Sequence, residues 1–78
     1  MSEPFFDQEL DCQGLLCPLP VLKTKQVLDS MGTGKVLRLL ATDPGSVSDM
    51  EAWTRQTGNE LLDHREGDGV YTYYVRKV

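Results

Sequence analysis

The sequence predicts an α/β two-layer sandwich in which two helices cover one face of a four-stranded mixed sheet. Segments rich in strand formers alternate with two segments of helical periodicity, and a Gly-Asp-Gly turn divides the last two strand-like segments. The resulting element order is βαβαββ. Right-handed crossovers between parallel strands then bring both helices to the same face of the sheet.

The first half of the chain contains a short strand, a helix and a buried strand. Residues 9–12 alternate in polarity with Leu10 and Cys12 on one face, and Gly14 turns the chain. Residues 18–31 have helical periodicity, and their predicted buried stripe comprises Val21, Thr24, Val27, Leu28 and Met31. Residues 35–41 are nearly all apolar, which is typical of a central strand.

The second half begins with a new helix start in the segment TDPGS. Thr42 or Asp43 is the expected N-cap, and Pro44 suits the first helical position. The predicted buried stripe comprises Val47, Met50, Trp53 and Thr57, and Gly58 fits the position after the helix end. Residues 59–66 and 70–77 are the two remaining strands, and the turn at 67–69 makes them a hairpin.

Length and charge exclude several classes of protein. The 78 residues predict a single domain, 1–78, with residues 1–8 as an N-terminal extension, and so small a core leaves no room for a large cofactor. The net charge is −4, from 12 acidic and 8 basic residues, which disfavours direct nucleic-acid binding. No apolar run approaches the roughly 18 residues of a membrane span, so we expect a cytoplasmic protein.

Cys17 is the candidate nucleophile. It precedes Pro18 and Pro20, and proline is tolerated in the first turn of a helix because the backbone N–H groups there have no helical partner. Cys17 is then the expected N-cap, where the helix dipole and free N–H groups would lower the thiol pKa. The alternative is that Cys17 is a small apolar residue in a loop.

The segment LDCQGLLCPLPVLKTK resembles the TusA/SirA family of small sulfur carriers, whose signature is L-D-x-x-G-L-x-C-P-x-P. The matching residues are Leu10, Asp11, Gly14, Leu15, Cys17, Pro18 and Pro20. The later segments ATDPGSVSDMEAW, TGNELL and YYVRK are also similar to the family, so the resemblance covers nearly the whole chain. It implies the βαβαββ sandwich and a Cys17 that carries sulfur as a persulfide, with Pro18 and Pro20 fixing the site and Gly14 shaping its loop.

The resemblance also implies partners. A cysteine desulfurase or a rhodanese-type sulfurtransferase would supply sulfur, an acceptor protein would receive it, and the carrier would be a monomer that forms transient complexes. Members linked to tRNA thiolation tend to have an acid between the two prolines, where this chain has Leu19. The chain is more similar to members tied to sulfur trafficking and oxidation.

Exposed leucines near Cys17 are candidates for docking. On an ideal helix Leu19, Leu22 and Lys23 lie opposite the buried stripe, and Leu15 and Leu16 in the preceding loop add to the apolar surface. Isolated exposed leucines are also common on protein surfaces, so both interpretations stay open.

Cys12 is a possible second thiol. A bend at Gly14 would bring it near Cys17 for a reversible disulfide, whereas the alternation of the strand turns it toward the core. His64 is far along the chain and is interpreted as a surface or edge residue rather than a base. Two cysteines and one histidine do not make a zinc site, so we expect no metal.

The main alternative to a sulfur carrier is a non-catalytic regulatory or protein-interaction module. A thiol redox module that uses Cys12 and Cys17 is a further alternative. RNA contact would follow only from the shape of the fold, and fold does not imply function.

Overall fold

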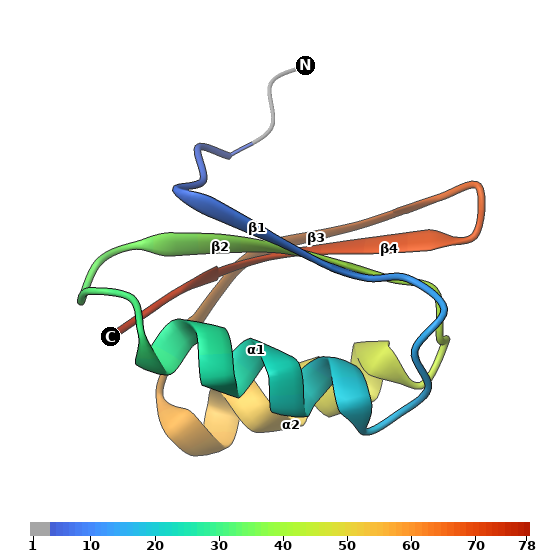
Figure 1. Ribbon diagram of the computed structural model, residues 1–78, viewed down its shortest axis with the longest axis horizontal. Helices are drawn as coiled ribbons and strands as arrows, with labels where there is room; N and C mark the ends of the chain where they lie inside the picture. Colours follow the sequence, from blue (N-terminus) through green and yellow to red (C-terminus); the bar gives the residue numbers. More distant parts are fainter. Residues whose placement is uncertain (1–3) are drawn as a thin grey trace.

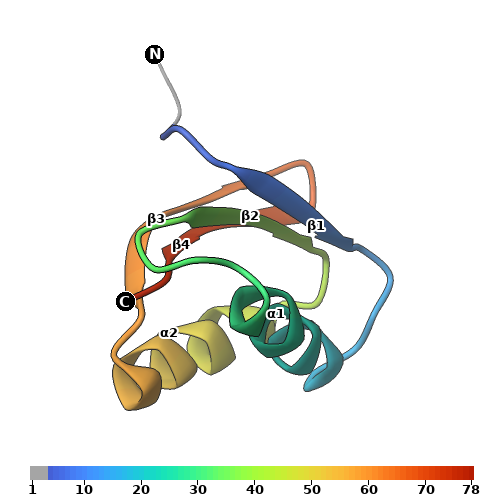
Figure 2. The same cartoon turned by 60° about the vertical axis from the view of Figure 1, so that its left-hand side comes forward.

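The computed structural model describes residues 4–78 and confirms the predicted element order. The elements are β1 (Gln8–Cys12), α1 (Leu19–Asp29), β2 (Val36–Ala41), α2 (Ser46–Thr57), β3 (Glu60–Gly67) and β4 (Val70–Arg76). The strands form one sheet in the order β1-β2-β4-β3, and both helices cover the same face of it (Figures 1 and 2). The structure is therefore the expected two-layer sandwich.

The sheet is mixed because its strands pair in both senses. β1 runs parallel to β2, with Cys12 opposite Ala41, whereas β4 is antiparallel to β2 and to β3. The β3–β4 hairpin turns at Asp68 and Gly69, whose φ angles of 54° and 78° are the positive values that a two-residue hairpin turn requires. This confirms the hairpin predicted from the Gly-Asp-Gly segment.

The core lies between the sheet and the helices. β2 and β4 are the central strands and supply most of it, and α1 and α2 close it from one side (Figure 2). Its buried apolar members are Cys12, Leu28, Met31, Leu37, Leu39, Ala41, Met50, Tyr73 and Val75. Tyr73 keeps its polar end satisfied, because its hydroxyl lies 2.6 Å from the Ser46 hydroxyl at the start of α2.

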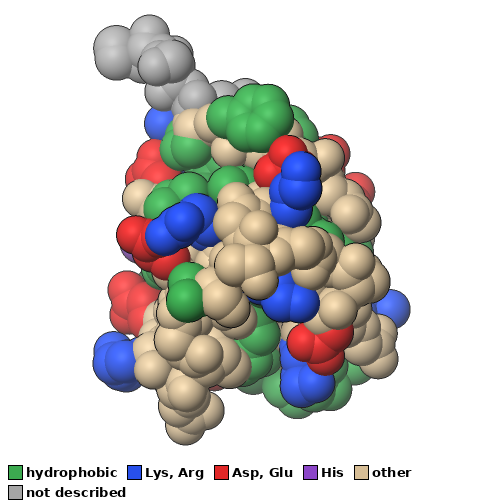
Figure 3. Space-filling view, turned by 90° about the vertical axis from the view of Figure 1, so that its left-hand side faces the viewer, with side chains coloured by type: hydrophobic (Ala, Val, Ile, Leu, Met, Phe, Trp, Pro, Cys, Tyr) green, Lys and Arg blue, Asp and Glu red, His purple; other side chains and the backbone are tan. Residues whose placement is uncertain are grey.

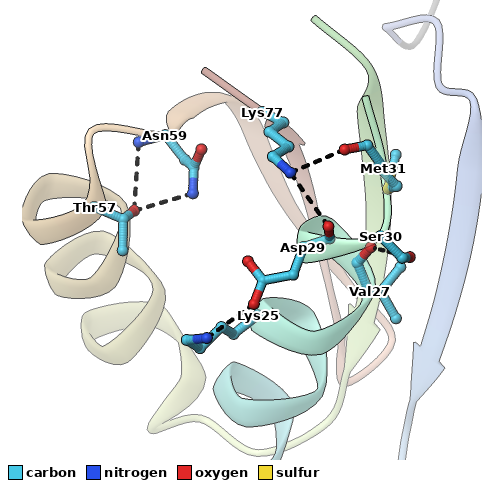
Figure 4. Close-up of polar contacts among 8 residues, drawn as sticks. All are labelled: Lys25, Val27, Asp29, Ser30, Met31, Thr57, Asn59 and Lys77. Carbon is cyan, nitrogen blue, oxygen red and sulfur yellow. Dashed lines mark hydrogen bonds and ion pairs between the residues drawn. The ribbon is translucent and has the colours of Figure 1, made fainter. Parts of the chain in front are cut away.

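The start and the last turn of α2 differ from the prediction. The N-cap is Gly45 rather than Thr42 or Asp43, and Pro44 precedes the cap instead of opening the helix. Thr57 was expected in the buried stripe but is exposed. It is the last residue of the helix, and its hydroxyl donates to the Trp53 carbonyl and accepts hydrogen bonds from Asn59, contacts that hold it at the surface (Figure 4).

Hydrogen bonds join the C-terminal segment to the end of α1, at the end of the molecule where both helices stop. Lys77 donates through Nζ to the carbonyl oxygens of Met31 and Asp29 at 2.9 and 3.4 Å, and Lys25 pairs with Asp29 at 2.8 Å (Figure 4). The surface there mixes basic and acidic side chains without a large area of one sign (Figure 3).

The expected N-terminal extension, residues 1–8, lies partly outside the described residues. Within the described part, Gln8 opens β1 and Asp7 bonds to β2, where its backbone N–H donates to the Val36 carbonyl at 2.8 Å. The Phe6 ring lies 6.4 Å from the ring of Tyr74. No helix within residues 4–78 is long and apolar enough to cross a membrane.

Candidate functional site

Two loops meet at the edge of the sheet where the parallel strands β1 and β2 end. The loop after β1 carries the Cys-Pro-Leu-Pro segment, and the loop after β2 carries Thr42 and Asp43. The Gly14 N–H donates to the Thr42 hydroxyl at 2.8 Å, and the Cys17 N–H donates to Asp43 Oδ2 at 2.8 Å. The second loop therefore fixes the first at two points.

Gly14 has a conformational role in this arrangement. Its φ angle is +85°, a left-handed value that residues with a Cβ rarely adopt, and the next N–H, that of Leu15, donates to the Cys12 carbonyl at 3.1 Å. The chain thus turns sharply after β1 and directs the following loop toward the start of α1. That Gly14 shapes the site for function stays a prediction.

The structure corrects the position of Cys17 relative to α1. The helix begins at Leu19, its N-cap is Pro18, and Cys17 lies one residue before the cap, joined to Pro18 by a cis peptide bond. Pro20 is the second helical residue and is buried, and its carbonyl accepts a hydrogen bond from the Thr24 hydroxyl at 2.7 Å. Pro20 anchors the helix start in the core, whereas Pro18 is exposed beside the sulfur.

Cys17 is exposed and borders a groove between α1 and α2. The groove has a volume of about 240 Å³, and the residues that line it are Cys17, Pro18, Val21, Asp49, Ala52, Trp53 and Gln56. Most of these side chains are apolar, and Asp49 is the charged residue among them. A reactant that reaches Cys17 therefore meets a mainly apolar wall and one carboxylate.

Asp49 sets the electrostatics of the sulfur. The Cys17 thiol donates a hydrogen bond to Asp49 Oδ2, and the Asp43 carboxylate lies close on the backbone side. The hydrogen bond to Asp49 raises the pKa of the Cys17 thiol, and desolvation and the negative charges of the two aspartates act in the same direction. The expectation that the helix dipole lowers this pKa is therefore wrong, because the nearest charged groups are anions.

Cys12 lies at the end of β1 and is fully buried in the core. Burial raises the pKa of its thiol, and neither cysteine is in a disulfide. The prediction that alternation turns Cys12 toward the core is confirmed. A role as a second thiol would require the core to open.

The residues predicted for docking divide into two groups. Leu19 and Leu22 are exposed to 43% and 50%, and Lys23 is exposed beside them. Leu15 is only partly exposed and packs against the core. Leu16, which is 71% exposed, offers the larger apolar surface in that loop.

His64 does not contribute to the groove. It lies on the edge strand β3, is exposed, and stacks on the ring of Tyr73 with the ring centroids 5.7 Å apart. The interpretation of His64 as a surface residue on an edge is confirmed.

Sequence reasoning missed one residue that contacts the sulfur, Asp49, and one that lines its groove, Trp53. Both residues belong to α2 and line the groove. They come 32 and 36 positions after Cys17 in the sequence. Asp43 was assigned to a helix cap and instead holds the Cys17 backbone. The parallel pairing of β1 and β2 is the one sequence-level signal that would have brought these loops together.

Comparisons with known proteins agree with this architecture. Residues 8–77 match the family model described as sulfurtransferase TusA. The chain is 51% identical over 72 residues to the sulfur carrier protein TusA of Allochromatium vinosum, covering 92% of this chain and 95% of that protein. It is 36% identical over 77 residues to the sulfur carrier protein TusA of Pseudomonas entomophila, covering 99% and 96% of the two chains.

A solved structure gives the same result for the fold. The SirA-like protein of Desulfitobacterium hafniense superimposes with a TM-score of 0.81 at 25% sequence identity, covering 90% of this chain and 96% of that one. The family match extends from the first residue of β1 to the residue after β4. The chain belongs to the TusA sulfurtransferase family.

Proposed function

We propose that this protein is a sulfur carrier in which Cys17 accepts sulfane sulfur as a persulfide and passes it to an acceptor protein. The observation that carries the proposal is the position of Cys17, exposed on a loop that two backbone hydrogen bonds fix. The relatives named sulfur carrier protein align along nearly their whole length, so the same role suits this chain.

The transfer is an exchange between thiols. The Cys17 sulfur attacks the outer sulfur of a donor persulfide, the donor S–S bond breaks, a new S–S bond forms at Cys17, and the donor leaves as a thiolate that takes up the thiol proton. Unloading repeats the exchange with the acceptor thiol as the attacking group. Neither step needs an external oxidant, because the sulfane sulfur moves with its oxidation state unchanged.

Exposure suits Cys17 to this exchange, since both partners must bring a cysteine of their own to it. The exposed surface formed by Leu16, Leu19 and Leu22 next to the sulfur offers an apolar contact for such partners, and Lys23 adds a cation. A cysteine desulfurase or a rhodanese-type sulfurtransferase is the donor class that we propose. Leu19 stands where family members linked to tRNA thiolation tend to have an acid, so the pathways that we propose are sulfur trafficking and oxidation. The cytoplasm is the proposed location, because thiols are kept reduced there.

Cys12 does not serve as a resolving thiol in this proposal. Its side chain is fully buried, and a disulfide with the exposed Cys17 would require the end of β1 to leave the core. The exchange needs only one cysteine on the carrier.

Mass spectrometry after incubation with a persulfide donor tests the proposal. We expect one added sulfur atom, about 32 Da, on the wild-type protein and on Cys12→Ala, and none on Cys17→Ser. Cys12→Ala is the matched control because alanine keeps an apolar side chain in the core. Loading of Cys17→Ser would refute the assignment of the carrier residue.

A further inference from the structure

The Cys17 thiol forms a hydrogen bond with Asp49 that needs the thiol proton. The thiol donates its proton to Asp49 Oδ2, and both side chains line the same groove. Asp43, the other acid at the site, already accepts the Cys17 backbone N–H at 2.8 Å. Asp49 is therefore the acid that contacts the reacting atom.

Loading changes what the sulfur offers to Asp49. In a persulfide the inner sulfur is bonded to carbon and to the outer sulfur, so it carries no proton and cannot donate to the carboxylate. The outer sulfur is more acidic than a thiol and is an anion at neutral pH, and a neighbouring carboxylate repels it. The same side chain that stabilises the empty thiol thus destabilises the loaded form.

We propose that Asp49 sets the sulfur-transfer equilibrium of this carrier, favouring the empty Cys17 thiol over the Cys17 persulfide and so promoting release to the acceptor. This inference rests on the proposed function, because it concerns how firmly Cys17 holds the sulfur. It assigns a role to a residue of α2 that lies outside the Cys-Pro-Leu-Pro segment.

The charged surroundings of the sulfur support this role. Asp49 faces Cys17 from α2 and Asp43 faces it from the loop before α2, while the α1 side of the groove contributes the uncharged Pro18 and Val21. Trp53 and Gln56 on α2 are also uncharged. Both charged groups that act on the Cys17 thiol are aspartates, and both disfavour its ionisation.

The equilibrium can be measured against a small thiol. The reaction is Cys17–SH + GS–SH ⇌ Cys17–S–SH + GSH, where GSH is glutathione and GS–SH its persulfide. The sulfane sulfur leaves the glutathione sulfur for Cys17, and the Cys17 thiol proton ends on the departing glutathione thiolate. Atoms and electrons balance without a further reagent.

The test compares Asp49→Asn with the wild type at fixed ratios of glutathione and its persulfide. Alkylation quenches each mixture, and intact mass separates the empty from the loaded protein. We expect Asp49→Asn to raise the equilibrium constant for loading roughly two- to fivefold, the range of exposed charge interactions. Glu51→Gln is the matched control, because it removes one exposed carboxylate from the same helix away from the groove and should leave the constant unchanged.

Iodoacetamide alkylation supplies a second readout that does not depend on sulfur carriage. The pH midpoint for alkylation of Cys17 should fall in Asp49→Asn and stay unchanged in Glu51→Gln. Asp49→Glu, which restores a carboxylate, should move both the midpoint and the equilibrium constant back toward the wild type. Thermal melts of all three variants identify any effect that comes from a loss of folding.

The outcomes separate the two proposals. A loading equilibrium that is equal in Asp49→Asn and wild type overturns the inference, even where the alkylation midpoint falls. A wild-type protein that never loads overturns the proposed function and the inference with it, and alkylation then still reports whether Asp49 contacts the thiol. A higher loading constant in Asp49→Asn, rescued by Asp49→Glu, supports the inference.

Discussion

Replacing Asp43 with alanine should loosen the Cys17 loop and destabilise the whole domain. The Asp43 carboxylate accepts the Cys17 N–H through Oδ2 at 2.8 Å and the Gly45 N–H through Oδ1 at 3.4 Å. A hydrogen bond to a charged group contributes about 1.5–3 kcal/mol. Because water can replace the carboxylate at the exposed Cys17, we take the lower limit, about 1.5 kcal/mol.

This magnitude converts to a measurable change in melting temperature. For domains of 60–100 residues, 1 kcal/mol corresponds to roughly 4–8 °C, so Asp43→Ala should melt roughly 6–12 °C below the wild type. Asp43→Asn keeps an acceptor oxygen without the charge and should lose about half as much. Circular dichroism during heating, supported by urea unfolding, measures both variants.

Thr42→Val is the matched control for the second anchor of the same loop. It removes the hydroxyl that accepts the Gly14 N–H at 2.8 Å and keeps the shape of the side chain, so we expect a loss of about 1 kcal/mol. The double variant should lose less than the sum, because both residues hold one loop. A melting temperature of Asp43→Ala within about 2 °C of the wild type would refute the idea that this carboxylate holds the loop.

Three further predictions concern the sulfur, the docking surface and the core. The hydrogen bond to Asp49 raises the pKa of the Cys17 thiol, so the thiolate forms only at higher pH. Alkylation of Cys17 should therefore have a higher pH midpoint than alkylation of an unstructured peptide with the same residues. An equal or lower midpoint contradicts this. Leu19→Glu should change stability by no more than about 0.5 kcal/mol yet slow sulfur transfer to an acceptor protein, whereas Leu62→Glu, equally exposed on β3, should not slow it. Tyr73→Phe should cost about 1–3 kcal/mol in urea unfolding, because it leaves the buried Ser46 hydroxyl without its partner; an unchanged midpoint would count against that hydrogen bond.

The fold was predictable because its signals are local. The alternation of β1, the apolar run of β2 and the turn at Asp68 and Gly69 each depend on residues close together in the sequence. The buried stripe of α1 was also correct in outline, with Thr24 and Leu28 fully enclosed. Periodicity reports burial directly, so these predictions held.

The helix starts were harder to predict because several residues compete for each cap. Thr42 and Asp43 have the side chains that favour an N-cap, but both bond to the Cys17 loop instead. The N-cap of α2 is therefore Gly45, which has no side chain to accept a capping hydrogen bond. A tertiary contact thus overrode a local preference.

The pKa of Cys17 was also mispredicted because a tertiary contact overrides the local sequence. From the sequence near Cys17, the expected helix start and its dipole predict a more acidic thiol. The thiol donates its hydrogen bond to Asp49, which lies 32 residues away in the sequence and acts on the sulfur directly. A direct hydrogen bond to an anion outweighs partial charges at a helix start that begins two residues after the sulfur.

The topology explains why this acid comes from α2. β1 and β2 are parallel and in register up to Cys12 and Ala41, so both strands end at the same edge of the sheet. The chain leaves each strand there and enters a helix, and both helices lie on the same face (Figure 1). The loop before α1 must therefore face the first turn of α2, which is where Asp49 lies. Asp49 can therefore reach Cys17 because the two parallel strands lead into their helices at the same edge of the sheet.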